Sequence, residues 1–176
     1  MKLRKINAVF SLISTVLLLI HAISLGIWML SQGRIHGAPS AIAIALTVCF
    51  LIHAIISIIL MATSHKGNKG LKGKAYPKLN VATVVQRISG ASMLIFTVLH
   101  ILTAVGVMHT PKPIHAVLHP LLFVLVLVHT AVSISKAFIT LGIGNARFIK
   151  RADIVIKVIC AVTLIGDIIG FYLFAC

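Results

Sequence analysis

Long apolar stretches alternate with short polar segments along the whole chain. A bilayer core of about 30 Å is crossed by about 20 helical residues, and five of the stretches reach that length. The pattern predicts an all-α integral membrane protein, a single transmembrane domain over residues 1–176, with helices at about residues 6–30, 38–62, 81–108, 113–141 and 154–174. The first stretch is too long for the apolar region of a signal peptide, and no small-x-small cleavage site follows it. We therefore expect it to be retained as a helix.

The basic residues of the loops fall on one side of this arrangement. They are the N-terminal Lys2, Arg4 and Lys5, five lysines between residues 65 and 78, and Arg147, Lys150 and Arg151 before the last helix. The two loops on the other side hold only Arg34 and Lys112. Because short loops rich in lysine and arginine stay in the cytoplasm, we expect a cytoplasmic N-terminus and an external C-terminus.

The composition excludes several classes of protein. The chain is 60% hydrophobic and only 10% charged, whereas soluble domains carry about 25% charged residues. The net charge of +14 does not indicate a nucleic-acid partner, because the basic residues lie between apolar stretches and not along one patch. The only acidic residues are Asp153 and Asp167, which argues against catalysis by paired carboxylates. Three scattered cysteines without C-x-x-C spacing argue against a disulfide framework, an iron–sulfur cluster or a cysteine zinc site.

Four of the nine histidines lie inside the first four predicted helices: His21, His53, His100 and His129. An ionisable residue inside a membrane span indicates function, since burying it without a partner is costly. At about 1.5 Å per residue, His53 and His129 lie roughly 14 and 18 Å from the cytoplasmic side, and His21 and His100 roughly 22 and 28 Å. Two pairs from alternate helices, one above the other, favour two bis-histidine haems in a bundle of helices one to four. Interhelical hydrogen bonds, a proton path and another metal site remain alternatives.

Small residues one helical turn after a ligand would leave room for a porphyrin. Ser57, Ala104 and Ser133 occupy this i+4 position after three of the histidines. His21 departs from the pattern, because Leu25 holds its i+4 position.

Other polar residues are candidates for the surroundings of such cofactors. Arg87, Ser89 and Lys136 are candidates for haem propionates, although the two cations could instead extend to the cytoplasmic surface. Arg34, His36, His115 and His119 would supply hydrogen-bond donors for a quinone near the external surface. His115 and His119, at i and i+4, are alternatively a metal-ligand pair. Asp167 is the one acidic residue expected deep within a span.

Several segments resemble one known family. Val85–His100 reads VQRISGASMLIFTVLH and resembles the Q-R-[IV]-[ST]-G…H segment of the cytochrome b membrane anchors of succinate:quinone oxidoreductases and quinol:fumarate reductases, in their single-subunit, five-helix, two-haem form. Phe50–Ser57 (FLIHAIIS) and Val128–Ser133 (VHTAVS) resemble the ligand segments of the second and fourth helices. Leu141–Arg151 resembles the loop that leads into the fifth helix. The resemblance covers about residues 46–174.

The resemblance implies a function beyond the residues themselves. It implies two haem b groups, the distal one on His21 and His100 and the proximal one on His53 and His129, and a quinone, often menaquinone, as substrate. It also implies a flavoprotein subunit and an iron–sulfur subunit on the cytoplasmic face of a prokaryotic cytoplasmic membrane. The chain is short for the family and lacks glutamate, so glutamate-dependent proton paths have no counterpart here. A haem-poor anchor of the same family and an unrelated membrane cytochrome b electron shuttle remain alternatives.

Overall fold

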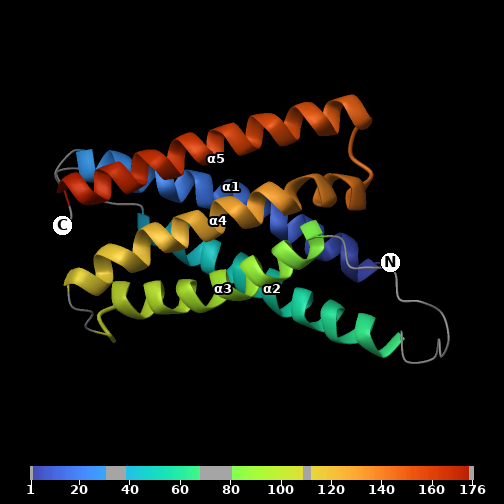
Figure 1. Ribbon diagram of the computed structural model, residues 1–176, viewed down its shortest axis with the longest axis horizontal. Coiled ribbons are helices and arrows are strands. Elements are labelled where there is room, and N and C mark those ends of the chain that lie inside the picture. Colours follow the sequence, from blue (N-terminus) through green and yellow to red (C-terminus); the bar gives the residue numbers. More distant parts are fainter. Residues whose placement is uncertain (1, 31–38, 68–80, 109–111, 175–176) are drawn as a thin grey trace.

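The computed structural model describes residues 2–30, 39–67, 81–108 and 112–174, and these form five long helices (Figure 1). The helices are α1 (Lys2–Leu30), α2 (Pro39–Gly67), α3 (Val81–Ala104), α4 (Lys112–Leu141) and α5 (Ala146–Phe174). The described residues contain no strand. Each helix is long and apolar enough to cross a membrane, so the predicted all-helical, five-span architecture is confirmed and indicates a multi-pass membrane protein.

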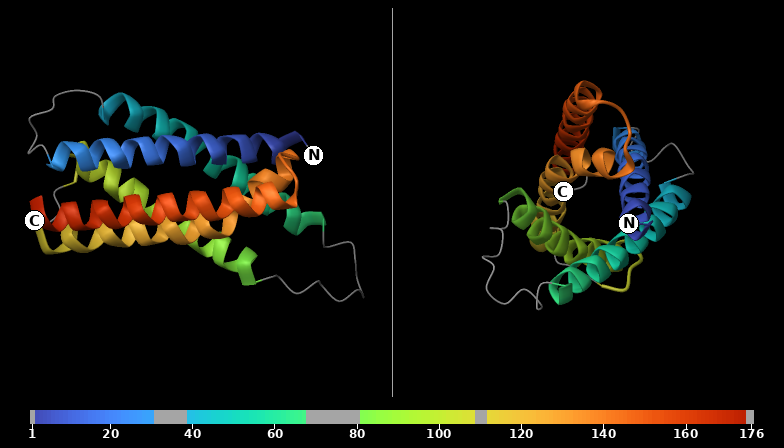
Figure 2. Two further views of the ribbon diagram at one scale, coloured as in Figure 1. Left: turned by 90° about the horizontal axis from the view of Figure 1, so that it is seen from above. Right: turned by 90° about the vertical axis from the view of Figure 1, so that its right-hand side faces the viewer.

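The first four helices surround a common axis, and α5 lies outside them (Figure 2). The main packing is between α1 and α2 and between α3 and α4, while α5 packs against α4 and α1. Most large apolar side chains face outward, as lipid contact requires, and the buried apolar core is small. Its centre is the cluster of Leu122 and Val126 from α4 with Leu164 from α5.

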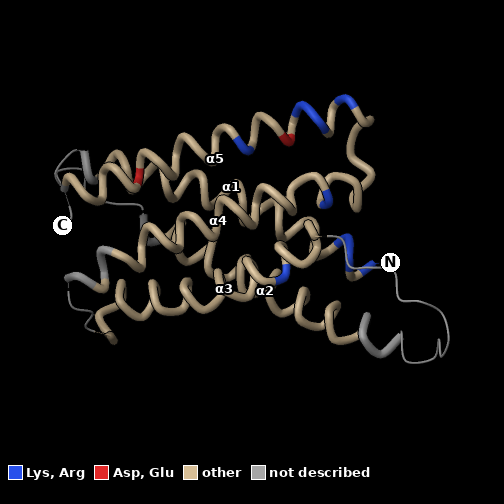
Figure 3. The backbone as a smooth tube through the Cα atoms, viewed as in Figure 1, with Lys and Arg blue, Asp and Glu red and all other residues tan. Residues whose placement is uncertain are grey.

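One end of the bundle carries the positive charge (Figure 3). Here α1, α3 and α5 begin and α2 and α4 end. We call it the basic end, after Lys2, Arg4, Lys5, Arg147, Lys150 and Arg151, and the other the opposite end. Among the side chains that the structure describes, every lysine and arginine lies in the half of its helix toward the basic end.

Two helix boundaries differ from the predicted ones. The last helix begins at Ala146 and not near residue 154, because the Asn145 side chain caps it: Asn145 Oδ1 accepts a hydrogen bond from the Phe148 N–H at 2.9 Å. The basic residues predicted in the preceding loop therefore lie in the first turns of α5. The third helix ends at Ala104 and not near residue 108, since the chain turns at Gly106, which has a φ of 75°.

A tight turn joins α4 to α5 at the basic end. Gly142, with a φ of 71°, donates its N–H to the Ile139 carbonyl, and the Ile143 N–H reaches the Phe138 carbonyl. These are the two hydrogen bonds of a Schellman ending. Gly144 follows with a φ of 73°, and a Cβ there would lie 2.2 Å from Phe148 Cδ1. Both conformation and space therefore require glycine at position 144.

We predict that Gly144→Ala destabilises the protein by about 1–2 kcal/mol, because alanine is strained at positive φ and its methyl group overlaps the Phe148 ring. Thermal unfolding in detergent would show a lower Tm. Gly166→Ala is the matched control, since no atom lies within 4 Å of a Cβ at that helical position. Equal melting temperatures for the two variants would contradict the structural role of Gly144.

Candidate functional site

The four predicted ligand histidines lie at two levels of the bundle. His53 and His129 contact the first turns of α1 and α3 and so belong to the half toward the basic end. His21 and His100 lie in the second halves of α1 and α3. At 1.5 Å per residue, His21 is about 20 Å along α1 from Asn7, the residue that His53 contacts. The two pairs thus lie at different heights along the bundle, while their joint binding of a cofactor stays a prediction.

His53 is held by α1. Its Nδ1 lies 3.2 Å from the backbone carbonyl oxygen of Asn7. The Asn7 side chain also bridges to Ser57, one turn after His53: the amide nitrogen donates to Ser57 Oγ at 3.1 Å, and the hydroxyl returns a bond to the amide oxygen at 3.3 Å. Ser57, the small residue at the i+4 position after His53, thus joins α2 to α1, and α1 supplies the carbonyl that orients His53.

His129 is held by α3. Its Nδ1 lies 3.2 Å from Ser89 Oγ, and the Ser89 hydroxyl in turn donates to the backbone carbonyl of Gln86 at 3.3 Å. Ser89 is only 4% exposed, so this contact is screened from solvent and lipid. A Cβ on Gly90 would lie 2.9 Å from His129 Cε1, which means that the imidazole occupies the space of a missing side chain.

These contacts determine which ring nitrogen carries the proton. A carbonyl oxygen can only accept a hydrogen bond, so Nδ1 of His53 must be the donor. At His129 the Ser89 hydroxyl gives its proton to the Gln86 carbonyl, so its oxygen is left to accept from Nδ1. In a neutral imidazole the remaining Nε2 then has a free lone pair. This tautomer is the one in which a histidine can bind a metal through Nε2.

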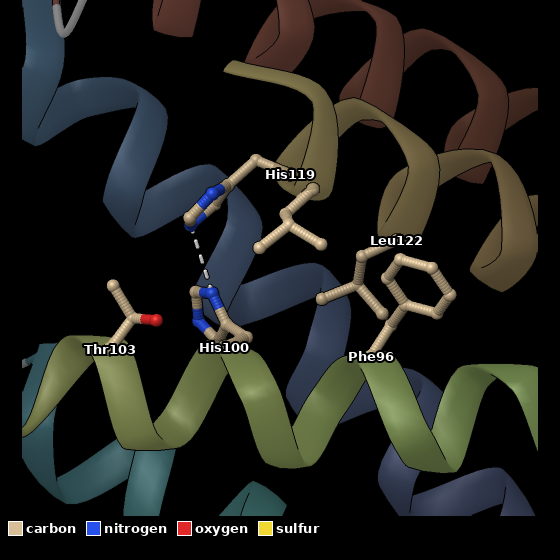
Figure 4. A pocket seen from close by; sticks show the side chains of 6 residues that line it. Phe96, His100, Thr103, His119 and Leu122 are labelled. Atoms are coloured by element: carbon tan, nitrogen blue, oxygen red, sulfur yellow. Dashed lines mark hydrogen bonds between the residues drawn. The ribbon is translucent and has the colours of Figure 1, made fainter. Parts of the chain in front are cut away.

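At the opposite end, His100 contacts His119, which the sequence pattern had suggested as a candidate for quinone binding (Figure 4). His100 Nδ1 and His119 Nε2 are 2.9 Å apart, and the rings are T-shaped with centroids at 4.8 Å. His119 also stacks on Phe171 of α5, with ring centroids 5.0 Å apart. The two histidines line a pocket together with Phe96, Thr103, Leu118 and Leu122. One of the two facing nitrogens must donate and the other accept.

Along α1, three polar residues recur every seventh position: Asn7, Ser14 and His21. Ser14 Oγ and His21 Nδ1 are buried and have no hydrogen-bond partner among the described residues. The pairing of His21 with His100 stays a prediction, and His21 is a buried imidazole whose Nδ1 lacks, among the described residues, the acceptor that His53 has.

The remaining predicted site residues have diverse positions. Lys136 Nζ donates to Gln86 Oε1 at 2.7 Å and lies 3.4 Å from Thr83 Oγ1, so it joins α4 to α3 near the basic end. Arg87 is partly buried in the first half of α3. Arg34 and His36 lie outside the described residues, and His115 lies in α4 without a described side chain.

Three functional neighbours were absent from the expected site: Asn7, Gln86 and Phe171. Asn7 could have been noticed in the sequence as an amide inside an apolar stretch, since it lies seven residues before Ser14 and fourteen before His21. Gln86 acts on His129 by way of Ser89 through its backbone carbonyl, which every residue has, so no side-chain pattern could reveal it. Phe171 was indistinguishable from a lipid-facing aromatic residue until α5 was placed against α4.

No protein-family model, no curated protein and no solved structure matches the chain. Among the described residues, no three histidine, cysteine or aspartate side chains converge on one point. A metal ion held by three or four protein ligands is therefore not supported there, whereas a haem iron needs only two axial ligands. The chemistry has to be argued from the paired imidazoles.

Proposed function

We propose that the chain is a dihaem cytochrome b that carries electrons across a membrane. The observation that supports this proposal is a pair of contacts made by His53 and His129: each Nδ1 is engaged by another helix, which would leave each Nε2 lone pair for a metal. A haem iron with two histidine ligands exchanges single electrons and needs no open coordination site. His21 and His100 would hold the second haem, nearer the opposite end.

The residues around the ligands fit this use. Gly90 gives the His129 ring its place beside α3, and Asn7 and Ser57 hold His53. Partners that accept the second ring proton orient a ligating imidazole and raise its basicity. At the opposite end, His119 Nε2 would accept a hydrogen bond from His100 Nδ1 and would orient the His100 ring in the same way.

The three residues predicted to bind haem propionates do not fit that role equally well. Lys136 and Ser89 already have protein partners, Gln86 and His129 respectively. Arg87 has a permanent cation in the half of α3 toward the basic end and is therefore the preferred candidate for a haem propionate. His119, in the pocket at the opposite end, is the described candidate for contact with a quinone.

We further propose that the chain is the membrane anchor of a succinate dehydrogenase or fumarate reductase, with its basic end in a prokaryotic cytoplasm. The QRISG…H segment around Arg87 and His100 supports this family. A flavoprotein and an iron–sulfur subunit would dock at the basic end, and a quinone, often menaquinone, would exchange electrons near the other. An unrelated membrane cytochrome b shuttle would bind no flavoprotein, so co-purification from native membranes distinguishes the two.

The central test is haem quantification on the purified chain with reduced-minus-oxidised spectra. We expect two b-type haems per chain. His53→Ala and His129→Ala should each remove the same haem, because one missing axial ligand leaves the iron bound on one side only. His21→Ala and His100→Ala should remove the other.

His65→Ala is the control, since this histidine lies at the end of α2 and outside the candidate ligand set. A wild-type chain that binds no haem would refute the proposal. Retention of both haems in His21→Ala would instead transfer this ligand position to another histidine, with His115 or His119 as the next candidate.

We predict that Gly90→Ala weakens binding of only one haem, the one proposed to lie between His53 and His129. The new methyl group would displace the His129 ring, and overpacking of this kind costs about 1–3 kcal/mol, so affinity should fall roughly tenfold or more. Haem titration followed by absorbance would measure this change. Gly166→Ala, with open space at its Cβ, should bind haem as the wild type does; equal weakening in both variants would point to general instability.

The orientation is separately testable with alkaline phosphatase, which is active only outside the cytoplasm. A fusion after Cys176 should be active and a fusion at Lys72 inactive, because the basic loops stay inside. The reverse activities would place the docking end outside the cell and exclude cytoplasmic partner subunits.

A further inference from the structure

The two acidic residues of the chain lie in contrasting surroundings, although both are in α5. Asp153 is near the basic end, where Oδ2 is 2.6 Å from Lys157 Nζ and Oδ1 accepts a hydrogen bond from the Ser135 hydroxyl of α4. A carboxylate with a cation and a hydroxyl donor is stabilised in its charged form. Asp153 therefore serves as an internal reference for an ionised carboxylate.

Asp167 has neither kind of partner among the residues that the structure describes. Its side chain is only 3% exposed, and Oδ2 is buried without a hydrogen-bond partner among the described residues. Oδ1 faces the backbone of α1, where a Cβ on Gly26 would lie 3.2 Å away. The carboxyl group is therefore enclosed between α5 and α1 at a point where α1 lacks a side chain.

No permanent cation is available to Asp167 in the part of the chain whose side chains are described. Every described lysine and arginine lies in the half toward the basic end. The titratable groups near the opposite end on the packed helices are His21 of α1 and His119 of α4, with Cys160 and Tyr172 on α5 itself. His119 contacts α5 through Phe171, one turn beyond Asp167.

An isolated carboxylate in such a place is unfavourable. Transfer of an ionised carboxylate from water to a low-dielectric interior is so costly that a buried acid usually takes up a proton instead. The neutral acid keeps a hydroxyl donor and an acceptor oxygen, and its burial requires only hydrogen bonding and not charge compensation. The enclosure by α1 and α5 thus favours the protonated form over the ion.

We propose that Asp167 is a proton-binding site in the half of the membrane opposite the basic end, occupied by a proton at neutral pH. The exchange is a simple acid–base couple: the carboxylic acid releases one proton to leave the carboxylate, and the carboxylate takes one up. No oxidant or reductant takes part. Its use as a proton donor or acceptor for a quinone at this end rests on the proposed function, but proton binding itself does not.

The test uses the scarcity of acids in this chain. Cell-free synthesis into lipid with aspartate labelled with carbon-13 at the side-chain carboxyl yields two labelled side chains, because the chain has two acidic residues. Solid-state carbon NMR at pH 7 should show one carboxylate, Asp153, and one carboxylic acid, Asp167. The acid signal should convert to a carboxylate signal only on titration to alkaline pH.

Two variants assign the signals. Asp153→Asn leaves Asp167 as the single labelled carboxyl, so the assignment holds even where Asp167→Asn does not fold. An acid signal at pH 7 in Asp153→Asn supports the proposal, and a carboxylate signal there overturns it. Because the measurement needs no haem, its failure would leave the dihaem proposal intact, and absence of haem would leave this one intact.

Discussion

Hydrocarbon offers no hydrogen-bond partner, and each polar group within this bundle therefore has to find its partner in the protein. The backbone meets this demand through five helices that bond internally. Two histidines meet it across helices: His53 of α2 bonds to the Asn7 carbonyl of α1, and His129 of α4 bonds to Ser89 of α3. Ser14 Oγ, His21 Nδ1 and Asp167 Oδ2 instead have no partner among the described residues. In neutral rings of His53 and His129 the same contacts would leave Nε2 unprotonated, which is the state that the proposed haem requires of its ligands.

Close approach between helices is the second condition, and it depends on absent side chains. Lipid is as apolar as leucine, so helices in a membrane associate through packing and polar contacts rather than through exclusion of water. Gly90 allows an imidazole of α4 to lie against α3, and Gly26 allows the Asp167 carboxyl of α5 to lie against α1. In both cases a polar group occupies the volume that a Cβ would fill. The small i+4 residue Ser57 acts in a related way, because it joins α2 to Asn7 of α1.

The two ends of the bundle differ chemically, and this difference gives the proposed electron path a direction in space. The basic end has the cations, the Lys136–Gln86 bridge and the ion pair of Asp153 with Lys157. The opposite end has the His100–His119 pair and Asp167, without a described cation. Soluble partner subunits would find charge at the first end. A quinone, which is apolar and exchanges protons as well as electrons, would find imidazoles and a carboxyl group at the second.

The number of spans and their approximate positions could be predicted from the sequence, because length and apolarity are local properties of a helix. The sequence misplaced the beginning of α5, where one side-chain cap at Asn145 outweighed the charge pattern. It also offered no way to see the acceptors Asn7 and Gln86, which act through backbone carbonyls, or the contact of His100 with His119. Those depend on how each helix is rotated and tilted against its neighbours. Only the tertiary structure decides such rotations, since periodicity in a segment that is apolar on all sides does not mark which face is buried.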